Sequence, residues 1–232
     1  MSFLLAPKRA RGIEILDDPG VAPDVMARSM RDVVRANILF GGRRAALAEL
    51  LPSLQAMPGR GDILDIGTGL GDIPTAAKKL AKSIGVELRT LGIDTSPPLV
   101  NLQRATMDAV VRGDALALPF GDQSVDVVMA SQVLHHFPLD SAVVLVREMN
   151  RVARKRVVIS DLRRSRIAAA GLWLGSFPLG FHPISRHDGV VSVMRGFLPA
   201  ELAEIVEAAT GQRPVVHRRL GFRLTTSWNP QP

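Results

Sequence analysis

Three glycines stand at alternate positions directly after a short apolar run. Residues 63–72 read Ile-Leu-Asp-Ile-Gly-Thr-Gly-Leu-Gly-Asp, so Gly67, Gly69 and Gly71 follow a predicted buried strand and precede a predicted helix. Glycines at such a turn let a ligand approach the backbone where a side chain would collide with it. Their G-x-G-x-G spacing differs from the G-x-G-x-x-G of dinucleotide-binding enzymes. Alone, the motif indicates either a ligand-binding loop or a structural turn.

An acidic residue, Asp94, ends the next predicted strand, which finishes in Leu-Gly-Ile. Ligands bind at the carboxyl ends of parallel strands. A carboxylate there can accept both hydroxyls of a ribose, which favours an adenosine-type ligand over a bare phosphate. Because residues 95–98 read Thr-Ser-Pro-Pro, Asp94 also has the position of a helix N-cap, and the two roles are compatible.

A third segment, residues 112–120, reads Arg-Gly-Asp-Ala-Leu-Ala-Leu-Pro-Phe, and an apolar run then leads through Ser131-Gln132 to Leu134-His135-His136. With these motifs the chain resembles the class I S-adenosylmethionine-dependent methyltransferases, in particular the branch of ubiquinone, menaquinone and small-molecule methyltransferases. The shared order is D-x-G-x-G-x-G, a ribose-binding acid, G-D-A-x-x-L-P-F and L-H-H. The resemblance extends over residues 60–160.

The resemblance implies S-adenosylmethionine as the cofactor. The backbone from Gly67 to Gly71 would hold its methionine portion, Asp94 its ribose, and Asp114 with Ala115 its adenine. Ser131 and Gln132 would lie near the reactive methyl group. The expected cofactor-binding residues are Asp65, Gly67, Thr68, Gly69, Gly71, Asp94, Thr95, Asp114, Ala115, Ser131 and Gln132.

Methyl transfer from a sulfonium requires a nucleophile held in line, and we expect no metal. A positioned base would help a hydroxyl nucleophile, and histidine is the usual base. His135 and His136 follow a strand that ends at the expected site, whereas His182 and His187 lie in a later segment that closes over the acceptor in related enzymes. Each could instead be a packing or capping residue. We select His187, expected in a loop before residues 190–197, and His136 as candidate catalytic residues.

Short apolar runs alternate with helical segments from residue 62 onward, which is typical of β-α-β units. The predicted strands are residues 63–66, 87–93, 109–112, 125–130, 156–160, 214–218 and 222–227. The predicted helices are residues 25–38, 43–54, 73–83, 98–107, 140–154 and 199–210. The pattern predicts a Rossmann-like α/β fold: a seven-stranded, mostly parallel sheet with a C-terminal antiparallel hairpin and helices on both faces.

The chain divides into a helical N-terminal extension or lid, residues 1–58, and a methyltransferase domain, residues 59–232. Within that domain, residues 163–198 are interpreted as an insertion that covers the acceptor. The insertion is rich in apolar side chains, namely Leu172, Trp173, Leu174, Phe177, Leu179 and Phe181. With the amphipathic N-terminal helix it predicts an apolar lid, although core packing or a dimer face is equally consistent.

The net charge is +7, and residues 151–166 contribute most of it. A basic patch can bind nucleic acid or anionic lipid, or can be a solvated helix end. After the fourth predicted strand, residues 130–133 read Ala-Ser-Gln-Val and not the Asn/Asp-Pro-Pro-aromatic of base methylation, so we expect no nucleic-acid partner. Peripheral membrane contact and a homodimer remain open.

The chain has no cysteine, which excludes disulfides and cysteine-bound zinc and fits a reducing compartment. At the N-terminus the apolar residues precede the basic ones, the reverse order of a secretory signal, so we expect a cytoplasmic protein. The predicted function is methylation of a hydrophobic small molecule, with O-methylation of a phenol, quinol or polyketide-type aromatic first. The alternatives are a C-methyltransferase of quinone-type biosynthesis and a non-catalytic cofactor-binding scaffold.

Overall fold

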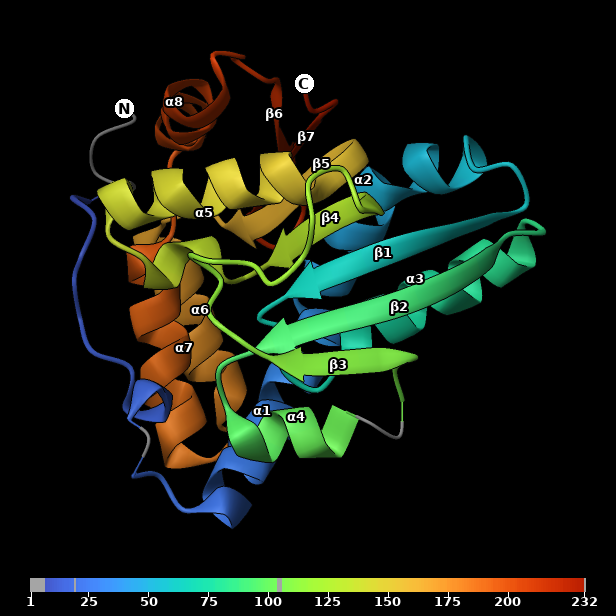
Figure 1. The fold of residues 1–232 in the computed structure, drawn as a ribbon. Helices are drawn as coiled ribbons and strands as arrows, with labels where there is room; N and C mark the ends of the chain where they lie inside the picture. Colours follow the sequence, from blue (N-terminus) through green and yellow to red (C-terminus); the bar gives the residue numbers. More distant parts are fainter. Residues whose placement is uncertain (1–6, 19, 104–105, 232) are drawn as a thin grey trace.

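The computed structural model describes residues 7–18, 20–103 and 106–231 (Figure 1). The apolar N-terminal stretch used for the localisation prediction, and part of the predicted helix 98–107, lie outside the described residues. None of the helices in the described ranges is long and apolar enough to cross a membrane.

One seven-stranded sheet forms the centre of the molecule. Its strands are β1 (Arg60–Ile66), β2 (Glu87–Asp94), β3 (Ala109–Arg112), β4 (Val125–Ser131), β5 (Ala153–Leu162), β6 (Val216–Arg219) and β7 (Arg223–Trp228). They lie in the order β3-β2-β1-β4-β5-β7-β6. Strands β1 to β5 are parallel, whereas β7 is antiparallel to both β5 and β6. The predicted mostly parallel sheet with a C-terminal antiparallel hairpin is confirmed.

Helices cover both faces of this sheet, as predicted. One face packs against α2 (Gly42–Gln55) and α3 (Asp72–Ser83), and the other against α5 (Leu139–Val152) and α8 (Pro199–Thr210). Covering on both faces explains why β4 is an almost unbroken apolar run, with its first six residues buried. The buried residues of α5 recur at helical spacing and turn one stripe to the sheet. They are Ala142, Leu145, Val146, Met149 and Val152.

A second group of helices gathers beyond the carboxyl ends of the parallel strands, on the side to which the arrowheads of β1, β2 and β3 point in Figure 1. The group comprises α1 (Pro23–Leu39), α4 (Pro97–Gln103), α6 (Arg166–Ser176), α7 (Pro183–Arg195) and the short helices η1 (Ile15–Asp17) and η2 (Leu134–His136). The Asp188 carboxylate on α7 accepts the backbone N–H groups of Ile15 and Leu16, at 2.9 Å each. Residues 7–18 are thereby held against α7.

Two sequence predictions are wrong in local detail. The helix expected over residues 140–154 ends at Val152, because Ala153 already pairs with Val125 as the first residue of β5. His187, expected in a loop, lies within α7. That helix begins at Pro183, a favoured first helical residue, and the His182 side chain accepts the N–H of Ile184 as a cap.

Helix α2 was assigned by sequence to the N-terminal extension, residues 1–58. In the structure its buried residues Ala46, Leu50 and Leu54 pack with sheet residues such as Ile63 and Val127. Helix α2 is therefore part of the central layers, and α1 is the helix of this region that lies at the carboxyl edge.

The basic run of residues 151–166 is largely paired within the protein. Arg151 forms ion pairs with Glu148 and Asp122, and Arg164 pairs with Glu201. At the start of β5, Arg154 and Lys155 both pair with Asp126. These contacts favour a structural role over an open patch for a polyanion.

A buried carboxylate connects α2 to the C-terminal hairpin. Glu49 accepts hydrogen bonds from Thr225 and Ser227 on β7 and from Arg219 on β6, at 2.6–2.8 Å. Burial alone would raise its pKa, but these three donors outweigh burial and hold the pKa below its ordinary value of 4.5. The charged form of Glu49 is therefore the one that the folded state stabilises.

We expect Glu49→Gln to lower the free energy of unfolding at neutral pH by about 1.5–3 kcal/mol, the worth of a hydrogen bond to a charged group. Because the folded pKa lies below the unfolded one, the wild-type advantage is complete above about pH 5 and declines as the pH falls through the folded pKa. Urea denaturation at neutral pH and at about pH 3 measures the difference. Glu204→Gln, on the exposed face of α8, is the control and should change little. A pH-independent Glu49 effect would contradict the assignment.

Candidate active site

A cavity of about 1010 Å³ opens at the carboxyl edge of the sheet. Its floor comes from the ends of β1, β2 and β4, and its walls from α1, α6, α7, residues 14–18 and Val21. Binding sites for single small molecules occupy about 300–1,000 Å³. The cavity lies at the upper end of this range, as expected for a site that holds a large ligand.

The glycine loop, residues 67–71, lies next to this cavity and has three positions without a side chain. Gly67, Gly69 and Gly71 have φ of 61°, 56° and 70°, a region that favours glycine. A Cβ on Gly67 would lie 2.5 Å from a methyl carbon of Val133, so no side chain fits there. The Gly67 N–H donates to the Ile93 carbonyl at 2.8 Å, which fixes the loop to the end of β2.

Both carboxylate oxygens of Asp94 accept hydrogen bonds from backbone N–H groups. Its Oδ2 accepts the N–H of Gly69 at 3.1 Å, and its Oδ1 accepts the N–H of Ser96 at 2.9 Å. Burial raises the pKa of this carboxyl despite these hydrogen bonds. Asp94 thus ties the glycine loop to the residue before α4 and also lines the cavity. Because α4 begins at Pro97, Asp94 is not its N-cap.

Unpartnered polar atoms concentrate on the cavity surface. Five buried side-chain atoms in the described part of the chain have no hydrogen-bond partner, and four of them belong to cavity-lining residues. Those four are Asp65 Oδ1, Ser131 Oγ, His135 Nε2 and Arg223 Nε. Buried polar groups are normally paired. The cavity is therefore suited to a ligand with several polar groups.

Asp65 is the most perturbed of these groups. Burial, with a smaller contribution from the neighbouring carboxylates Asp72 and Asp94, raises its pKa to about 8, although a hydrogen bond with Thr68 opposes the shift. A positively charged ligand group beside Asp65 would restore its ionised form. The acidic floor and bare glycine backbone thus fit an aminoacyl sulfonium nucleoside such as S-adenosylmethionine.

Most of the expected cofactor-binding residues line the cavity. They are Asp65, Gly67, Thr68, Gly69, Asp94, Thr95, Ala115, Ser131 and Gln132. The two others are not among the lining residues. Gly71 is the N-cap of α3, and the exposed Asp114 side chain accepts the N–H of Leu116 at 2.9 Å.

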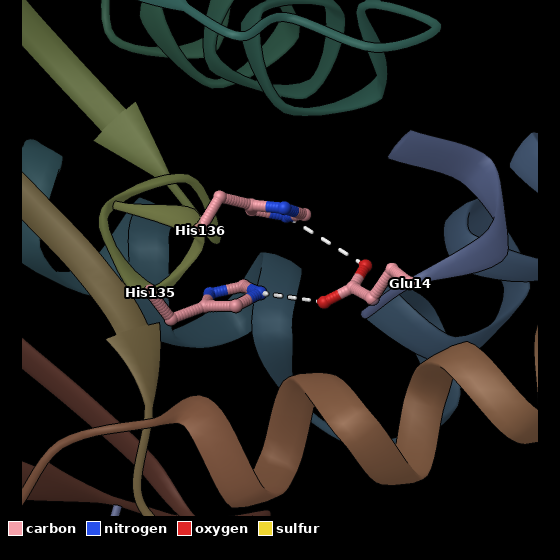
Figure 2. A group of neighbouring side chains, drawn as sticks. All are labelled: Glu14, His135 and His136. Carbon is pink, nitrogen blue, oxygen red and sulfur yellow. Dashed lines mark ion pairs between the residues drawn. The ribbon is translucent and has the colours of Figure 1, made fainter. Parts of the chain in front are cut away.

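The two candidate catalytic histidines lie in different places. His136 lines the cavity, whereas His187 does not: its half-exposed side chain contacts Asp188 with Nδ1 2.8 Å from Oδ1. His135, considered in the sequence but not selected, also lines the cavity and is fully buried. Its Nδ1 lies 2.7 Å from Oδ1 of Asp161 at the end of β5. Figure 2 shows both rings of η2 directed toward Glu14.

Sequence reasoning missed a chain of polar side chains across the cavity floor. Arg223 donates to Gln132 at 2.6 Å, Gln132 donates to Asn37, and Asn37 donates to Asp72 at 3.3 Å. Gln132 has φ of 57°, a strained value for a residue with a side chain, and such strain is concentrated at functional sites. Asn37 could have been noticed as a polar residue among the apolar positions of α1. Glu14 and Arg223 carried no local signal.

The cavity has a polar floor and an apolar wall. Apolar side chains from α1 and α6 face the floor across the space. The wall is formed by Met26, Met30, Val33, Val34, Ile167, Ala168 and Leu172. The polar half suits the cofactor, and the apolar half suits a hydrophobic second molecule.

Comparison with known proteins gives a consistent picture. The family described as "Methyltransferase domain" matches residues 64–160. The chain is 32% identical over 186 residues to a demethylmenaquinone methyltransferase of Roseiflexus sp. (strain RS-1), covering 73% of this chain and 75% of that relative. It is 32% identical over 210 residues to the enzyme of that name from Roseiflexus castenholzii, covering 84% and 83%.

A solved structure shares the fold. A magnesium protoporphyrin IX methyltransferase from Synechocystis PCC 6803, with bound S-adenosylmethionine, superposes with a TM-score of 0.55 at 14% identity, over 94% of this chain and 89% of that one. The likeness in fold, the similarity to the Roseiflexus enzymes and the match over the glycine loop agree with the chemistry of the cavity. The chain belongs to the class I S-adenosylmethionine-dependent methyltransferases, and S-adenosylmethionine is its cofactor.

Proposed function

We propose that this enzyme methylates a hydrophobic small molecule that carries a quinol or phenol ring. The observation that carries the proposal is the single cavity in which the polar glycine-loop floor faces the apolar wall of α1 and α6. The two Roseiflexus relatives named for demethylmenaquinone support a quinone-type ring. We therefore place C-methylation of a quinone-type acceptor beside the O-methylation that the sequence put first.

On the cofactor side, we propose the roles that the family resemblance implied. The loop backbone at Gly67 and Gly69 would hold the methionine portion, Asp94 the ribose hydroxyls, and Ala115 with Asp114 the adenine. Bound S-adenosylmethionine supplies an electrophilic methyl group on its sulfonium. The protein positions the acceptor in line with that group and keeps water away.

On the acceptor side, His136 remains the proposed polar contact, and His135 joins it. Both lie between the cofactor floor and residues 14–18, where an acceptor oxygen would meet an imidazole. The location of His187 outside the cavity removes the support for it as a base. A hydroxyl or quinol oxygen held there would be oriented and made more nucleophilic by these groups.

Helix α6 supports peripheral contact with a membrane, from which a lipid-like acceptor could be taken. Its outer side exposes Trp173, Leu174 and Phe177, each at least 48% accessible. Arg186 of α7 stacks over the Phe177 ring at 4.3 Å, which adds a cation next to these apolar groups. Apolar side chains mixed with cations suit an interface with anionic lipid.

The direct test is incubation with ¹³C-methyl-labelled cofactor and a panel of quinols and phenols of increasing side-chain length. We expect one labelled methyl group on a hydrophobic ring acceptor, and the carbon shift of the product distinguishes O- from C-methylation. Absence of transfer to every quinol and phenol, by protein that binds S-adenosylhomocysteine, would contradict the proposal.

Asp94→Ala should weaken S-adenosylhomocysteine binding by about 1.5–3 kcal/mol for each lost ribose hydrogen bond. Calorimetric titration measures the change. Asp122→Ala, far along the chain in an exposed turn, is a suitable control. Equal affinity in Asp94→Ala and wild type would show that the ribose binds elsewhere.

Asp65 should release a proton when the ligand binds. Its pKa of about 8 in the ligand-free protein means that it is mostly protonated at neutral pH. The ligand ammonium favours the carboxylate, so affinity should rise with pH up to about 8, by at most about tenfold per pH unit. Titrations in buffers of different ionisation enthalpy count the released protons. Asp65→Asn should abolish this release, and Asp140→Asn, on the exposed start of α5, should keep it.

Gly171→Leu tests the apolar wall. Gly171 lines the cavity from α6, and a Cβ there would meet no atom within 4 Å, so the larger side chain enters open space. We expect a higher acceptor KM or lost turnover with unchanged S-adenosylhomocysteine affinity. Ala170→Leu, the exposed neighbour outside the cavity lining, is the matched control. Equal kinetics in both variants would place the acceptor elsewhere.

A further inference from the structure

We propose that Glu14, His135 and His136 bind one divalent transition-metal ion at the acceptor side of the cavity. The sequence led us to expect no metal, since sulfonium chemistry does not require one. Figure 2 shows the three side chains meeting from two separate elements, the segment before η1 and the short helix η2. Their possible ligand atoms all lie within 4.8 Å of one another.

The spacing of these atoms fits a shared ion better than it fits direct hydrogen bonds. His135 Nε2 lies 3.9 Å from Glu14 Oε1, and His136 Nε2 lies 3.9 Å from Glu14 Oε2. Both distances are too long for a hydrogen bond. They are shorter than about 4.2 Å, which is twice a typical bond of zinc to nitrogen or oxygen, so one ion can contact both ends of each pair.

The opposite edge of each imidazole ring is held by a carboxylate. Nδ1 of His135 lies 2.7 Å from Asp161, and Nδ1 of His136 lies 3.2 Å from Asp17. An ionised carboxylate can only accept, so in the neutral rings both Nδ1 atoms carry the hydrogen and both Nε2 atoms are available as ligands. Metal-binding histidines typically have such a carboxylate behind them, which orients the ring and strengthens the ligand.

One of these ligand atoms has no hydrogen-bond partner among the residues that the structure describes. His135 Nε2 is buried and unpartnered, and its side chain is 2% exposed. A buried ring nitrogen without a partner is costly, and this one faces a carboxylate that is itself only 6% exposed. A cation between the two groups would remove this cost. This unpartnered nitrogen points to a bound ion, and it does so independently of which residue types form the cluster.

Neighbouring donors leave one side of Glu14 free. Ser192 and Arg195 both donate to its Oε1, at 2.8 and 3.0 Å. Its Oε2 faces His136 Nε2 without such a donor among the described residues. Arg195 also pairs with Asp17, so its guanidinium holds the carboxylates of Glu14 and Asp17 in place. An ion bound through Oε2 would keep these contacts.

The ligand set selects the class of ion. Two imidazoles and one carboxylate suit zinc, cobalt, nickel, manganese or iron(II), and not calcium or magnesium, which prefer oxygen ligands alone. Three protein ligands leave coordination positions open, and all three residues line the cavity. If the proposed function holds, an open position receives the oxygen of the phenol or quinol, whose hydroxyl proton passes to solvent when the oxygen binds the ion.

The test is metal binding by the whole chain without cofactor or acceptor. Titration with Co²⁺, followed by visible absorption, and with Zn²⁺, followed by calorimetry, should give one ion per chain. Glu14→Gln and His135→Gln should each weaken binding at least about tenfold. Asp17→Asn, which removes the carboxylate behind His136 together with its ion pair to Arg195, should weaken binding by about 10- to 100-fold. His217→Gln, an exposed histidine on β6, is the control for surface binding and should leave the affinity unchanged.

Affinity for S-adenosylhomocysteine is measured on every variant and reports that the cofactor half is folded. Absence of saturable binding, or equal affinity in wild type and Glu14→Gln, would overturn the metal site. The proposed methyl transfer would stand in that case if metal-free protein methylates a quinol. Saturable metal binding without methyl transfer would instead preserve the site and contradict the proposed function.

Discussion

The backbone hydrogen bond from Gly67 to Ile93 is the contact on which the site depends. It holds the glycine loop against the end of β2 and so positions the N–H of Gly69 for its hydrogen bond to Asp94. Parallel pairing of β1 with β2 and β4 then brings residues from three distant segments to one edge. Without this closure, the loop backbone and the carboxylate would not face the same space.

The same edge explains why the cofactor half could be predicted and the acceptor half could not. Gly67, Asp94 and Ser131 each follow a strand, and a parallel sheet places strand ends together whatever the loops do. The position of Glu14 depends instead on how residues 7–18 pack on α7. That packing rests on contacts across more than 170 residues, such as Ile15 with Asp188, and leaves no periodic trace in the sequence.

The choice between histidines illustrates the difference. His187 was favoured because its segment was expected to be a loop over the acceptor, but the Pro183 helix start turns it into a half-exposed helix position. His135 is oriented by Asp161, which lies 26 residues later on β5. Strand β5 ran longer than the expected residues 156–160, and Asp161 stood just beyond that boundary. Because the predicted strand ended two residues before the observed one, the pair of His135 and Asp161 was not recognised from the sequence.

The binding of residues 7–18 across α7 has a consequence for how this protein can diversify. The cofactor floor and the acceptor contacts come from separate stretches of chain, and a short N-terminal segment supplies the carboxylate between the two histidine rings. Substitutions in that segment can alter which molecules are accepted while the glycine loop stays intact. Under the proposed function, acceptor specificity would therefore be set by a segment that can change without altering the glycine loop.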